Sequence, residues 1–454
     1  MTFRSIDPAT GETVHEHPVW DAATLEATLQ EAARAAPAWA ALPIEQRLGY
    51  LSRAAAILRE RRDELARLIT REMGKLYREA QAEVDKCAWV CDFYAEHAGE
   101  FLADEVRESD TRRALVVYQP LGTVLAVMPW NFPLWQVFRF AAPALAAGNT
   151  GLLKHASNVP LCALAIEEIW REAGVPAGVF RSLMIRADQV ASVIDDPRVH
   201  AVTLTGSEPA GRQVAARAGN RIKKSVLELG GSDAFVVLED ADLEQAVAQG
   251  VASRFLNAGQ SCIAAKRFIL VDAVAEAFLE RFRARVEALR VGDPMDPATE
   301  LAPMARIDLR DELHAQVSRS IEQGATPLTG CRPLDGPGAF YAPSILDGVK
   351  PGMLAYEEEL FGPVAIVIRA RDQDDALRIA NDSRFGLGGS VWTRDRARGE
   401  AFARAMACGS AFVNGMVKSD PRLPFGGIKA SGYGRELSRE GIREFVNIKT
   451  LWLG

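Results

Sequence analysis

The chain is poor in cysteine and histidine, and this scarcity argues against a metal-centred function. It contains six residues of each type among 454. No cysteine pair has the spacing of a zinc site together with a nearby histidine, so we expect no metal. Cys87 and Cys91 lie four residues apart on a predicted helix, and we interpret them as core packing. Scattered cysteines of this kind are typical of a reducing cytoplasm, which is the expected location.

Long apolar runs and blocks of basic residues are also missing. The first eight residues have no apolar core of the kind that signal peptides carry. The most apolar stretch, 140–153, is broken by Pro143 and Gly148 and is too short to span a bilayer. The net charge is −7, from 53 basic and 60 acidic residues, and no basic block alternates with aromatics. We therefore expect neither a membrane nor a nucleic acid as partner.

The length and the residue patterns predict a soluble α/β protein. A chain of 454 residues exceeds one compact core and predicts two or three domains. Helical patterns come first, over 21–36, ending near Pro37, and over 44–97, with a break at Gly74. Strand-like and helical runs then alternate in two series, which predicts parallel, doubly wound sheets. The strand candidates are 124–128, 150–154, 179–184, 201–205 and 225–229 in the first series, and 234–238, 267–271, 364–368, 389–392 and 411–414 in the second.

Two glycine-containing segments carry a carboxylate and a thiol. Glu228 precedes Gly230 and Gly231, and Cys262 follows Gly259 within Gly-Gln-Ser-Cys. Glycines let the backbone turn sharply and approach a ligand closely. Such loops suit covalent catalysis, in which a cysteine attacks the substrate and a carboxylate acts as the base. Taken alone the pattern is not specific, because most buried cysteines are small core residues and Glu228 could be an exposed acid at a strand end.

The common dinucleotide fingerprint G-x-G-x-x-G is absent. Its candidate replacement is the segment 205–211, Thr-Gly-Ser-Glu-Pro-Ala-Gly, which follows a predicted strand and opens a predicted helix. Backbone N–H groups and the helix dipole can hold a pyrophosphate at such a place. Alone, such a string is more often an ordinary strand-to-helix turn.

Further segments occur in a fixed order along the chain. They are Met-Pro-Trp-Asn-Phe-Pro at 128–133, Leu-Leu-Lys at 152–154, Glu-Glu-Leu-Phe-Gly-Pro at 358–363 and Pro-Phe-Gly-Gly-Ile-Lys-Ala-Ser-Gly at 424–432. Together with the segments around Glu228 and Cys262, this set resembles the aldehyde dehydrogenase superfamily from about residue 5 onward. Within it, the chain is most similar to bacterial succinate-semialdehyde dehydrogenases, especially the short type that carries Lys154-His155.

The resemblance implies the aldehyde dehydrogenase fold. It places a dinucleotide-binding domain at 1–110 and 124–228, a second α/β catalytic domain at 229–418, and an oligomerisation arm at 111–123 and 419–454. The arm would contain strand-like residues 114–117 and 445–451, with the C-terminal strand adding to a partner subunit. The implied assembly is a homodimer or a homotetramer.

The resemblance also implies the chemistry. Cys262 attacks the aldehyde carbon, and the Asn131 amide and the Cys262 backbone N–H stabilise the oxyanion that forms. Glu228 activates the water that hydrolyses the resulting thioester. Asn131 could otherwise be a turn residue before Pro133.

The implied cofactor is NADP, with NAD as a possible second one. The matching positions are Trp130, Lys154, Ser157, Gly206, Ser207, Leu229, Glu359 and Phe361. Lys154 would bind the adenine ribose and Glu359 the nicotinamide ribose. Relatives that prefer NAD carry an acid at the place of Ser157, and this acid would repel a 2′-phosphate. Alternatively, Lys154 and Glu359 are ordinary surface charges.

The implied substrate is an aldehyde with a distal carboxylate, and the implied reaction is oxidation of succinate semialdehyde to succinate. Arg139 and Ser419 would clamp the carboxylate. Trp135 and Phe425 would wall the channel, with Ser261 beside the nucleophile. Alternatively, Arg139 is merely solvated or ion-paired, and the aromatics are core residues. Three other readings remain: oxidation of glutarate semialdehyde or a neutral aliphatic aldehyde, a thiol hydrolase or acyltransferase without nucleotide, and a non-catalytic protein that kept the fold.

Overall fold

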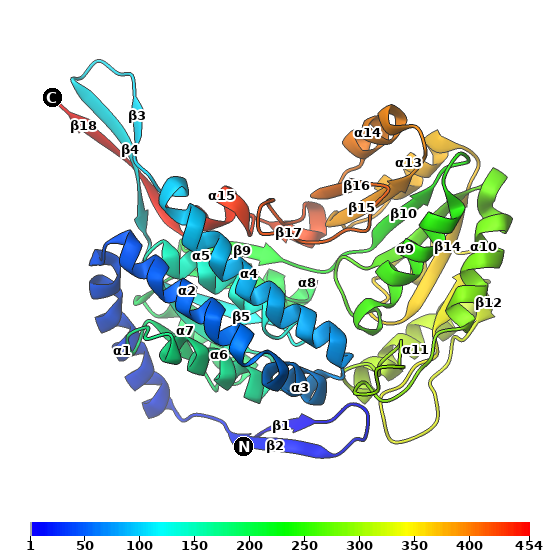
Figure 1. Cartoon of the computed structure of the whole chain (residues 1–454), viewed down its shortest axis with the longest axis horizontal. Coiled ribbons are helices and arrows are strands. Elements are labelled where there is room, and N and C mark those ends of the chain that lie inside the picture. Colours follow the sequence, from blue (N-terminus) through cyan, green and yellow to red (C-terminus); the bar gives the residue numbers. More distant parts are fainter. Residues whose placement is uncertain (1) are drawn as a thin grey trace.

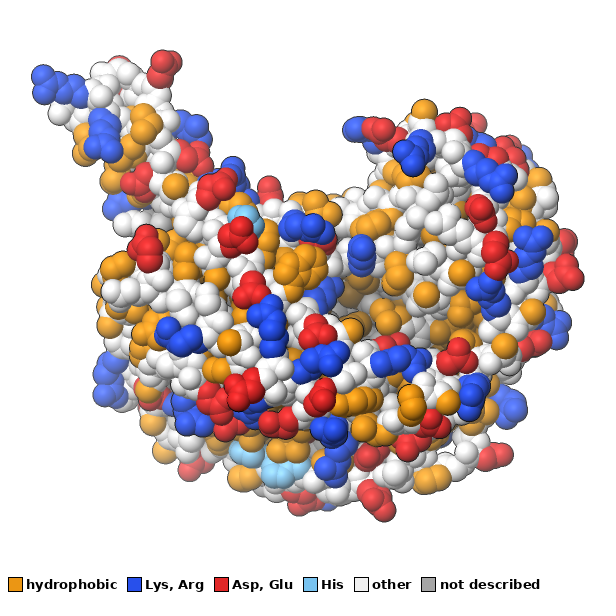
Figure 2. All heavy atoms as spheres, in the orientation of Figure 1, with side chains coloured by type: hydrophobic (Ala, Val, Ile, Leu, Met, Phe, Trp, Pro, Cys, Tyr) orange, Lys and Arg blue, Asp and Glu red, His pale blue; other side chains and the backbone are white. Residues whose placement is uncertain are grey.

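Two lobes and a projecting arm make up the molecule, as the computed structural model of residues 2–454 shows (Figure 1). Each lobe contains a mainly parallel sheet with helices on both faces. The arm rises from the first lobe, and the surface is hollowed between the two lobes (Figure 2). This architecture confirms the predicted α/β class with two sheets. No helix of the described residues combines the length and apolarity needed to cross a membrane.

The N-terminal region is a hairpin followed by helices. Its elements are β1 (Thr2–Ile6), β2 (Thr13–Pro18), α1 (Ala22–Ala41), α2 (Ile44–Glu60), α3 (Arg62–Met73) and α4 (Tyr77–Phe101). The predicted break at Gly74 is confirmed, because this residue ends α3 in the left-handed conformation with φ of 82°. The predicted end of the first helix near Pro37 is wrong. The helix continues through Pro37 to Ala41, and it is anchored there by buried Trp39, whose indole N–H donates to the Leu145 carbonyl.

The first lobe contains a six-stranded sheet in the order β17-β9-β8-β5-β6-β7, parallel except for β17. Its elements are β5 (Thr123–Met128), α5 (Trp135–Ala146), β6 (Thr150–His155), α6 (Pro160–Glu172), β7 (Phe180–Ser182), α7 (Val190–Asp195), β8 (Val199–Thr205), α8 (Glu208–Asn220), β9 (Lys224–Glu228) and β17 (Gly432–Tyr433). Successive residues of β5 alternate between two cores: Val124 and Ala126 face α2 to α6, whereas Leu125 faces α1, α7 and α8. The sheet is therefore doubly wound.

The second lobe contains a seven-stranded sheet in the order β12-β13-β14-β11-β10-β15-β16, parallel except for β12. Its strands are β10 (Asp233–Val237), β11 (Ala265–Val271), β12 (Thr326–Thr329), β13 (Ser344–Asp347), β14 (Val364–Ala370), β15 (Gly388–Trp392) and β16 (Ser410–Val413). Its helices are α9 (Leu243–Phe255), α10 (Asp272–Glu287), α11 (Ile307–Glu322), α12 (Leu354–Glu357), α13 (Gln373–Asn381) and α14 (Arg396–Ala405). Phe235 and Phe268 pack against α9 and α10, and Val236 and Ile269 face the opposite core.

The arm is a three-stranded antiparallel sheet in the order β18-β4-β3. It joins β3 (Glu105–Arg107), β4 (Arg113–Pro120) and β18 (Val446–Leu453), which follows the short helix α15 (Ser438–Ile442). Strand β18 pairs with β4 of its own chain, from Val446 opposite Pro120 to Leu453 opposite Arg113. Its other edge has no partner strand within residues 2–454. Strand β17, inside the segment 419–454 expected to form the arm, pairs instead with β9 of the first sheet.

Candidate active site

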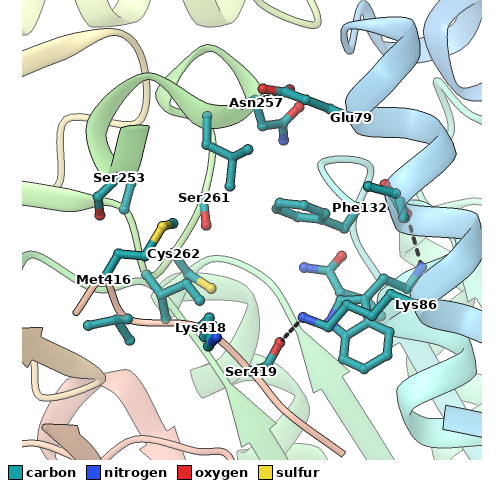
Figure 3. A pocket seen from close by; sticks show the side chains of 18 of the residues that line it. Glu79, Lys86, Phe132, Ser253, Asn257, Ser261, Cys262, Met416, Lys418 and Ser419 are labelled. Carbon is teal, nitrogen blue, oxygen red and sulfur yellow. Dashed lines mark hydrogen bonds between the residues drawn. The ribbon is translucent and has the colours of Figure 1, made fainter. Parts of the chain in front are cut away.

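A cavity of about 400 Å³ lies where the two lobes meet (Figure 3). Its walls come from α4, from α5 and the segment before it, from the end of α9 and the loop around Cys262, and from residues 416–425. Six of the predicted site residues line it: Trp135, Arg139, Ser261, Cys262, Ser419 and Phe425. Asn131 and Glu228 are not among the lining residues. The structure thus brings together side chains that are far apart in the sequence around one thiol.

The loop before Cys262 has an unusual backbone. Asn257, Ala258 and Gly259 all have positive φ angles, of 53°, 52° and 73°. A Cβ atom on Gly259 would lie 2.2 Å from the Gly362 carbonyl oxygen, so only glycine fits there. Likewise, a Cβ atom on Gly231 would lie 2.7 Å from the Cys262 carbonyl oxygen. The glycines noted in the sequence therefore allow the two loops to pack closely.

Lys266 holds this loop through hydrogen bonds to its backbone. The sequence pattern did not predict this role. Its ammonium donates to the Ser261 and Cys262 carbonyl oxygens at 2.8 and 2.9 Å. The same nitrogen lies 3.0 Å from the Glu359 carboxylate. One buried cation therefore connects the loop of Cys262 to the acid expected at the nicotinamide ribose.

The Cys262 thiol is half-buried at the cavity wall. Burial raises the pKa of this thiol to about 12, while the positive charges of Lys266 and Arg139 act in the opposite direction. The thiol is therefore neutral near pH 7 in the empty cavity. A base or an added positive charge is needed to form the reactive thiolate.

The loop of Cys262 contacts the Asn131 side chain, and both residues carry N–H groups that could serve an oxyanion. The Asn131 amide donates to the Gln260 carbonyl at 3.0 Å, and its oxygen accepts from Gln136 at 3.2 Å. A carboxamide has a second N–H, which is free to donate to an oxyanion. The Cys262 backbone N–H donates to no acceptor in residues 2–454. The oxyanion-binding roles expected for Asn131 and Cys262 stay predictions.

A buried ion pair holds the segment that carries Asn131. Glu83 accepts from the Leu134 and Trp135 N–H groups at 2.9 and 3.0 Å and pairs with Lys75, whose ammonium donates to the Asn131 carbonyl at 3.0 Å. The sequence reading missed Lys75 and Glu83, because two charges on helical segments do not reveal that both are buried.

His155 supports the same segment from β6. Its Nε2 donates to the Pro133 carbonyl at 2.8 Å, and its Nδ1 accepts from the Ala156 N–H. Burial lowers the pKa of His155 to about 4, so the ring is neutral and this tautomer is fixed. The Lys154-His155 pair noted in the sequence thus has one residue that packs inward beneath the Asn131 segment.

Glu228 ends β9 and is 2% exposed, so it is not an exposed strand-end acid. Neither carboxylate oxygen has a hydrogen-bond partner among the described residues. Burial raises its pKa well above the usual value, and the neighbouring Glu436 acts in the same direction while Arg139 opposes both. Such a carboxyl group is a stronger base, once ionised, than one in water.

Arg139 and Ser419 have different partners in the structure. Arg139 forms a buried ion pair with Glu436, and its guanidinium lies 4.7 Å from the centre of the Phe425 ring. The Ser419 hydroxyl instead accepts from the Lys86 ammonium at 2.8 Å. No hydrogen bond joins Arg139 to Ser419 in the part of the chain that the structure describes. The sequence reading anticipated an ion pair only as the alternative for Arg139, and it missed Lys86 and Glu436.

Most of the predicted cofactor residues lie on the first lobe, whereas Glu359 and Phe361 come from the second lobe, between α12 and β14. Lys154 and Ser157 line a groove of about 510 Å³ together with Arg4 and Arg186, and none of the described residues that line it is an acid. Ser207 is the N-cap of α8, and Gly206 donates its N–H to the Glu228 carbonyl at 2.9 Å. The rings of Trp130 and Phe361 meet edge to face with centroids 5.9 Å apart. Leu229 is buried against Gly211, and a Cβ atom on Gly230 would lie 2.2 Å from the Glu359 carboxylate.

Comparison with known proteins agrees with this geometry. Residues 1–451 match the aldehyde dehydrogenase family. The chain belongs to the aldehyde dehydrogenase family. This aldehyde dehydrogenase is 52% identical over 453 residues to a Synechocystis protein named "Probable succinate-semialdehyde dehydrogenase (NADP+)", with 100% of both chains covered. It is 49% identical over 448 residues to the Escherichia coli protein named succinate semialdehyde dehydrogenase (NAD(P)+) Sad, covering 99% of this chain and 97% of the relative.

A solved structure shows that the aldehyde dehydrogenase fold extends over the whole chain. Succinic semialdehyde dehydrogenase from Streptococcus pyogenes, solved in complex with NADP+, superposes with a TM-score of 0.98 at 40% identity, and the match covers 99% of each chain. The expected fold is therefore confirmed for this aldehyde dehydrogenase.

Proposed function

We propose that this aldehyde dehydrogenase oxidises succinate semialdehyde to succinate, with NADP as the preferred oxidant and NAD as a second one. The observation that carries the proposal is a single cavity that is lined by the Cys262 thiol and by cationic side chains, with Lys86 on the side opposite Cys262. An aldehyde that bears a carboxylate at its far end matches this distribution of groups. The names and cofactors of the most similar relatives support the same substrate and oxidant.

The residues divide the chemistry between them. Cys262 loses its proton and its sulfur bonds to the aldehyde carbon, and the resulting oxyanion accepts from the Cys262 N–H and the Asn131 amide. Bound NADP+ or NAD+ supplies the hydride acceptor. The acyl group on Cys262 is then a thioester. Glu228 takes a proton from the attacking water, and the C–S bond breaks to release the acid and the Cys262 thiolate.

The groups present on the first lobe fit a dinucleotide. Lys154 and Ser157 would hold the adenine ribose, and a 2′-phosphate there would meet Lys154. Arg4 and Arg186 line the same groove but already pair with Glu16 and Asp188, and no acid is among its described lining residues. The α8 N-terminus at Ser207 would face the pyrophosphate. Glu359, whose Oε1 pairs with the Lys266 ammonium at 3.0 Å, would also accept from the nicotinamide ribose. This charge distribution supports the preference for NADP.

Two neighbouring functions are disfavoured by particular observations. A thiol hydrolase that works without a nucleotide would need a side chain to take the proton of Cys262. Histidine is the usual base in such enzymes, and none is among the described residues that line the cavity. A dehydrogenase of neutral aldehydes would have no use for the cations at the far wall. Glutarate semialdehyde differs from the proposed substrate by one methylene, which is worth only about 1–3 kcal/mol of discrimination, so it is expected as a slower substrate.

Stopped-flow measurement of reduced cofactor tests the proposal. With succinate semialdehyde and NADP+, the wild-type protein should turn over, and Cys262→Ala should produce no reduced cofactor while still binding NADP+. Glu228→Gln should give a burst close to one equivalent followed by slow turnover, because the thioester forms but its hydrolysis lacks the base.

Other outcomes would contradict parts of the proposal. Oxidation by the Cys262→Ala variant would remove Cys262 as the nucleophile, and normal steady-state turnover of Glu228→Gln would remove Glu228 as the base. A wild-type protein whose kcat/KM for butanal equals its kcat/KM for succinate semialdehyde would be a general aldehyde dehydrogenase.

We also propose the domain roles and the assembly. The segments 1–110 and 124–228 bind the dinucleotide, 229–418 carry the nucleophile, and the arm built on 111–123 and 419–454 joins subunits into a homodimer or homotetramer. The arm supports this role because Ile448 and Trp452 of β18 are 62% and 57% exposed beside an edge without a partner strand among the described residues. Six free cysteines support a cytoplasmic location.

A further inference from the structure

The charge of Arg139 is already balanced within the protein. Its guanidinium pairs with the Glu436 carboxylate, and the two side chains are 3% and 6% exposed. A further N–H lies 3.4 Å from the Thr205 hydroxyl, and the guanidinium is stacked on Phe425. A substrate carboxylate at Arg139 would have to share this cation with a buried acid. Arg139 alone is therefore a poor receptor for an anion.

Lys86 presents a second cation in the same cavity. It lies on α4, and its ammonium is 4.4 Å from the centre of the Trp135 ring and 2.8 Å from the Ser419 hydroxyl. Figure 3 shows Lys86 and Ser419 on the side of the cavity opposite Cys262 and Ser261. The cavity thus has the thiol at one end and this ammonium–hydroxyl pair at the other.

The acids near Lys86 are engaged elsewhere. Glu83 pairs with Lys75, and Asp420 pairs with Arg422. Lys86 itself forms no ion pair within residues 2–454. Burial lowers the pKa of Lys86 to about 8, and the positive charge of Arg139 contributes in the same direction. A half-buried ammonium without a counter-ion is the group that gains most from an incoming carboxylate.

We propose that Lys86, together with the Ser419 hydroxyl, binds the distal carboxylate of the substrate, and that Lys86 determines the preference for acidic aldehydes. This inference rests on the proposed function. The face of Trp135 holds the ammonium in place. Ser419 can accept from Lys86 and still donate its own proton to the carboxylate. Arg139 with Glu436 then forms a neutral wall beside this subsite and contributes less to binding of the anion.

Three variants and two substrates test the proposal. Lys86→Met removes the charge and keeps the length, Lys86→Arg keeps the charge, and Lys418→Met removes an exposed lysine that also lines the cavity. For each protein, kcat and KM are measured with succinate semialdehyde and with butanal, a neutral aldehyde of the same carbon number. Thermal unfolding shows whether each variant folds.

The expected result is a change in the ratio of the two kcat/KM values. Loss of a charge-assisted contact should lower this ratio about ten- to a hundredfold in Lys86→Met, mainly through KM for succinate semialdehyde. Lys86→Arg should restore most of the ratio, and Lys418→Met should change it less than about threefold, because an exposed charge acts only through screened attraction.

Three results would overturn the proposal. If a folded Lys86→Met keeps the wild-type ratio, Lys86 does not contact the carboxylate. If Lys86→Met and Lys418→Met lower the ratio equally, the effect is general attraction and not a subsite. If the wild-type protein does not oxidise succinate semialdehyde at all, the proposed function fails first and the subsite fails with it. If Lys86→Met misfolds, Lys86→Arg decides. Its ratio of the two kcat/KM values must stay near that of the wild type, and a large loss would overturn the proposal.

Discussion

At the scale of single residues, the charge of Lys86 connects substrate recognition to pH. The charged and titratable groups around its ammonium are Arg139 on α5, Glu83 and Cys87 on α4, and Asp420 in the segment 416–425 that lines the cavity. Burial and Arg139 together place its pKa at about 8 in the empty cavity, so it is charged below pH 8 and increasingly neutral above it. Binding of a carboxylate requires the charged form.

The KM for succinate semialdehyde should therefore rise with pH when it is normalised to the KM for butanal. A pKa of about 8 predicts a rise of about tenfold between pH 7 and pH 9. Normalisation removes effects of Cys262 and Glu228 that both substrates share. In Lys86→Arg the normalised KM should stay constant, because guanidinium does not titrate in this range. A constant ratio in the wild type would contradict the titration of Lys86.

The sequence could predict residues whose role depends on local pattern, but not residues whose role depends on burial. Cys262, Glu228 and Asn131 stand in recognisable strings; only Cys262 lines the cavity, while Asn131 donates to the Gln260 carbonyl of the same loop and Glu228 acts electrostatically on the Cys262 thiol. Lys75, Lys86 and Lys266 are single lysines within helical or strand-like patterns, where surface exposure is the usual expectation. Only the packed structure shows that these side chains point inward: Lys75 from the turn before α4, Lys86 from α4 and Lys266 from β11.

At the scale of elements, periodicity located most of the strands and helices but not every boundary. The alternation of β5 between two cores and the end of α3 at Gly74 follow from side-chain period and backbone freedom. The continuation of α1 through Pro37 does not, because it depends on Trp39 reaching the Leu145 carbonyl in a distant helix. The pairing of β17 with β9 likewise joins residues about 200 positions apart, which no local pattern reveals.

The turn between β6 and α6 is the element on which cofactor choice should depend. Ser157 lies there, exposed, at the groove that also contains Lys154. Ser157→Glu should lower kcat/KM for NADP relative to NAD by about tenfold or more, because the carboxylate would lie near the 2′-phosphate. Ser157→Gln is the matched neutral control and should have a much smaller effect. Equal changes in both variants would show that size, not charge, matters at this position.

At the scale of the whole molecule, the arm is the part with least contact to either lobe (Figure 1). Figure 2 shows hydrophobic side chains exposed along it. An exposed strand edge flanked by apolar side chains is a template for pairing with another chain. The arm is therefore the surface on which we expect a second copy of the protein.

Light scattering coupled to size-exclusion chromatography tests this expectation. The wild-type protein should have the mass of a dimer or tetramer, and the double variant Ile448→Glu, Trp452→Glu should shift towards the monomer, because buried unpaired charges are costly at an interface. Val106→Glu, on the opposite strand β3 of the arm, is the control and should keep the wild-type mass. A monomeric wild type, or an unchanged mass in the double variant, would contradict the role given to β18.

The position of the cavity wall along the chain has a consequence for biosynthesis. Cys262 precedes Ser419, Phe425 and Glu436 by more than 150 positions, and the edge strand β17 of the first sheet comes later still than Ser419 and Phe425. During translation, a nascent chain can assemble β5 to β9 and the nucleophile loop before the roof of the cavity exists. The cavity around the thiol can therefore be completed only after residues 416–425 have been synthesised.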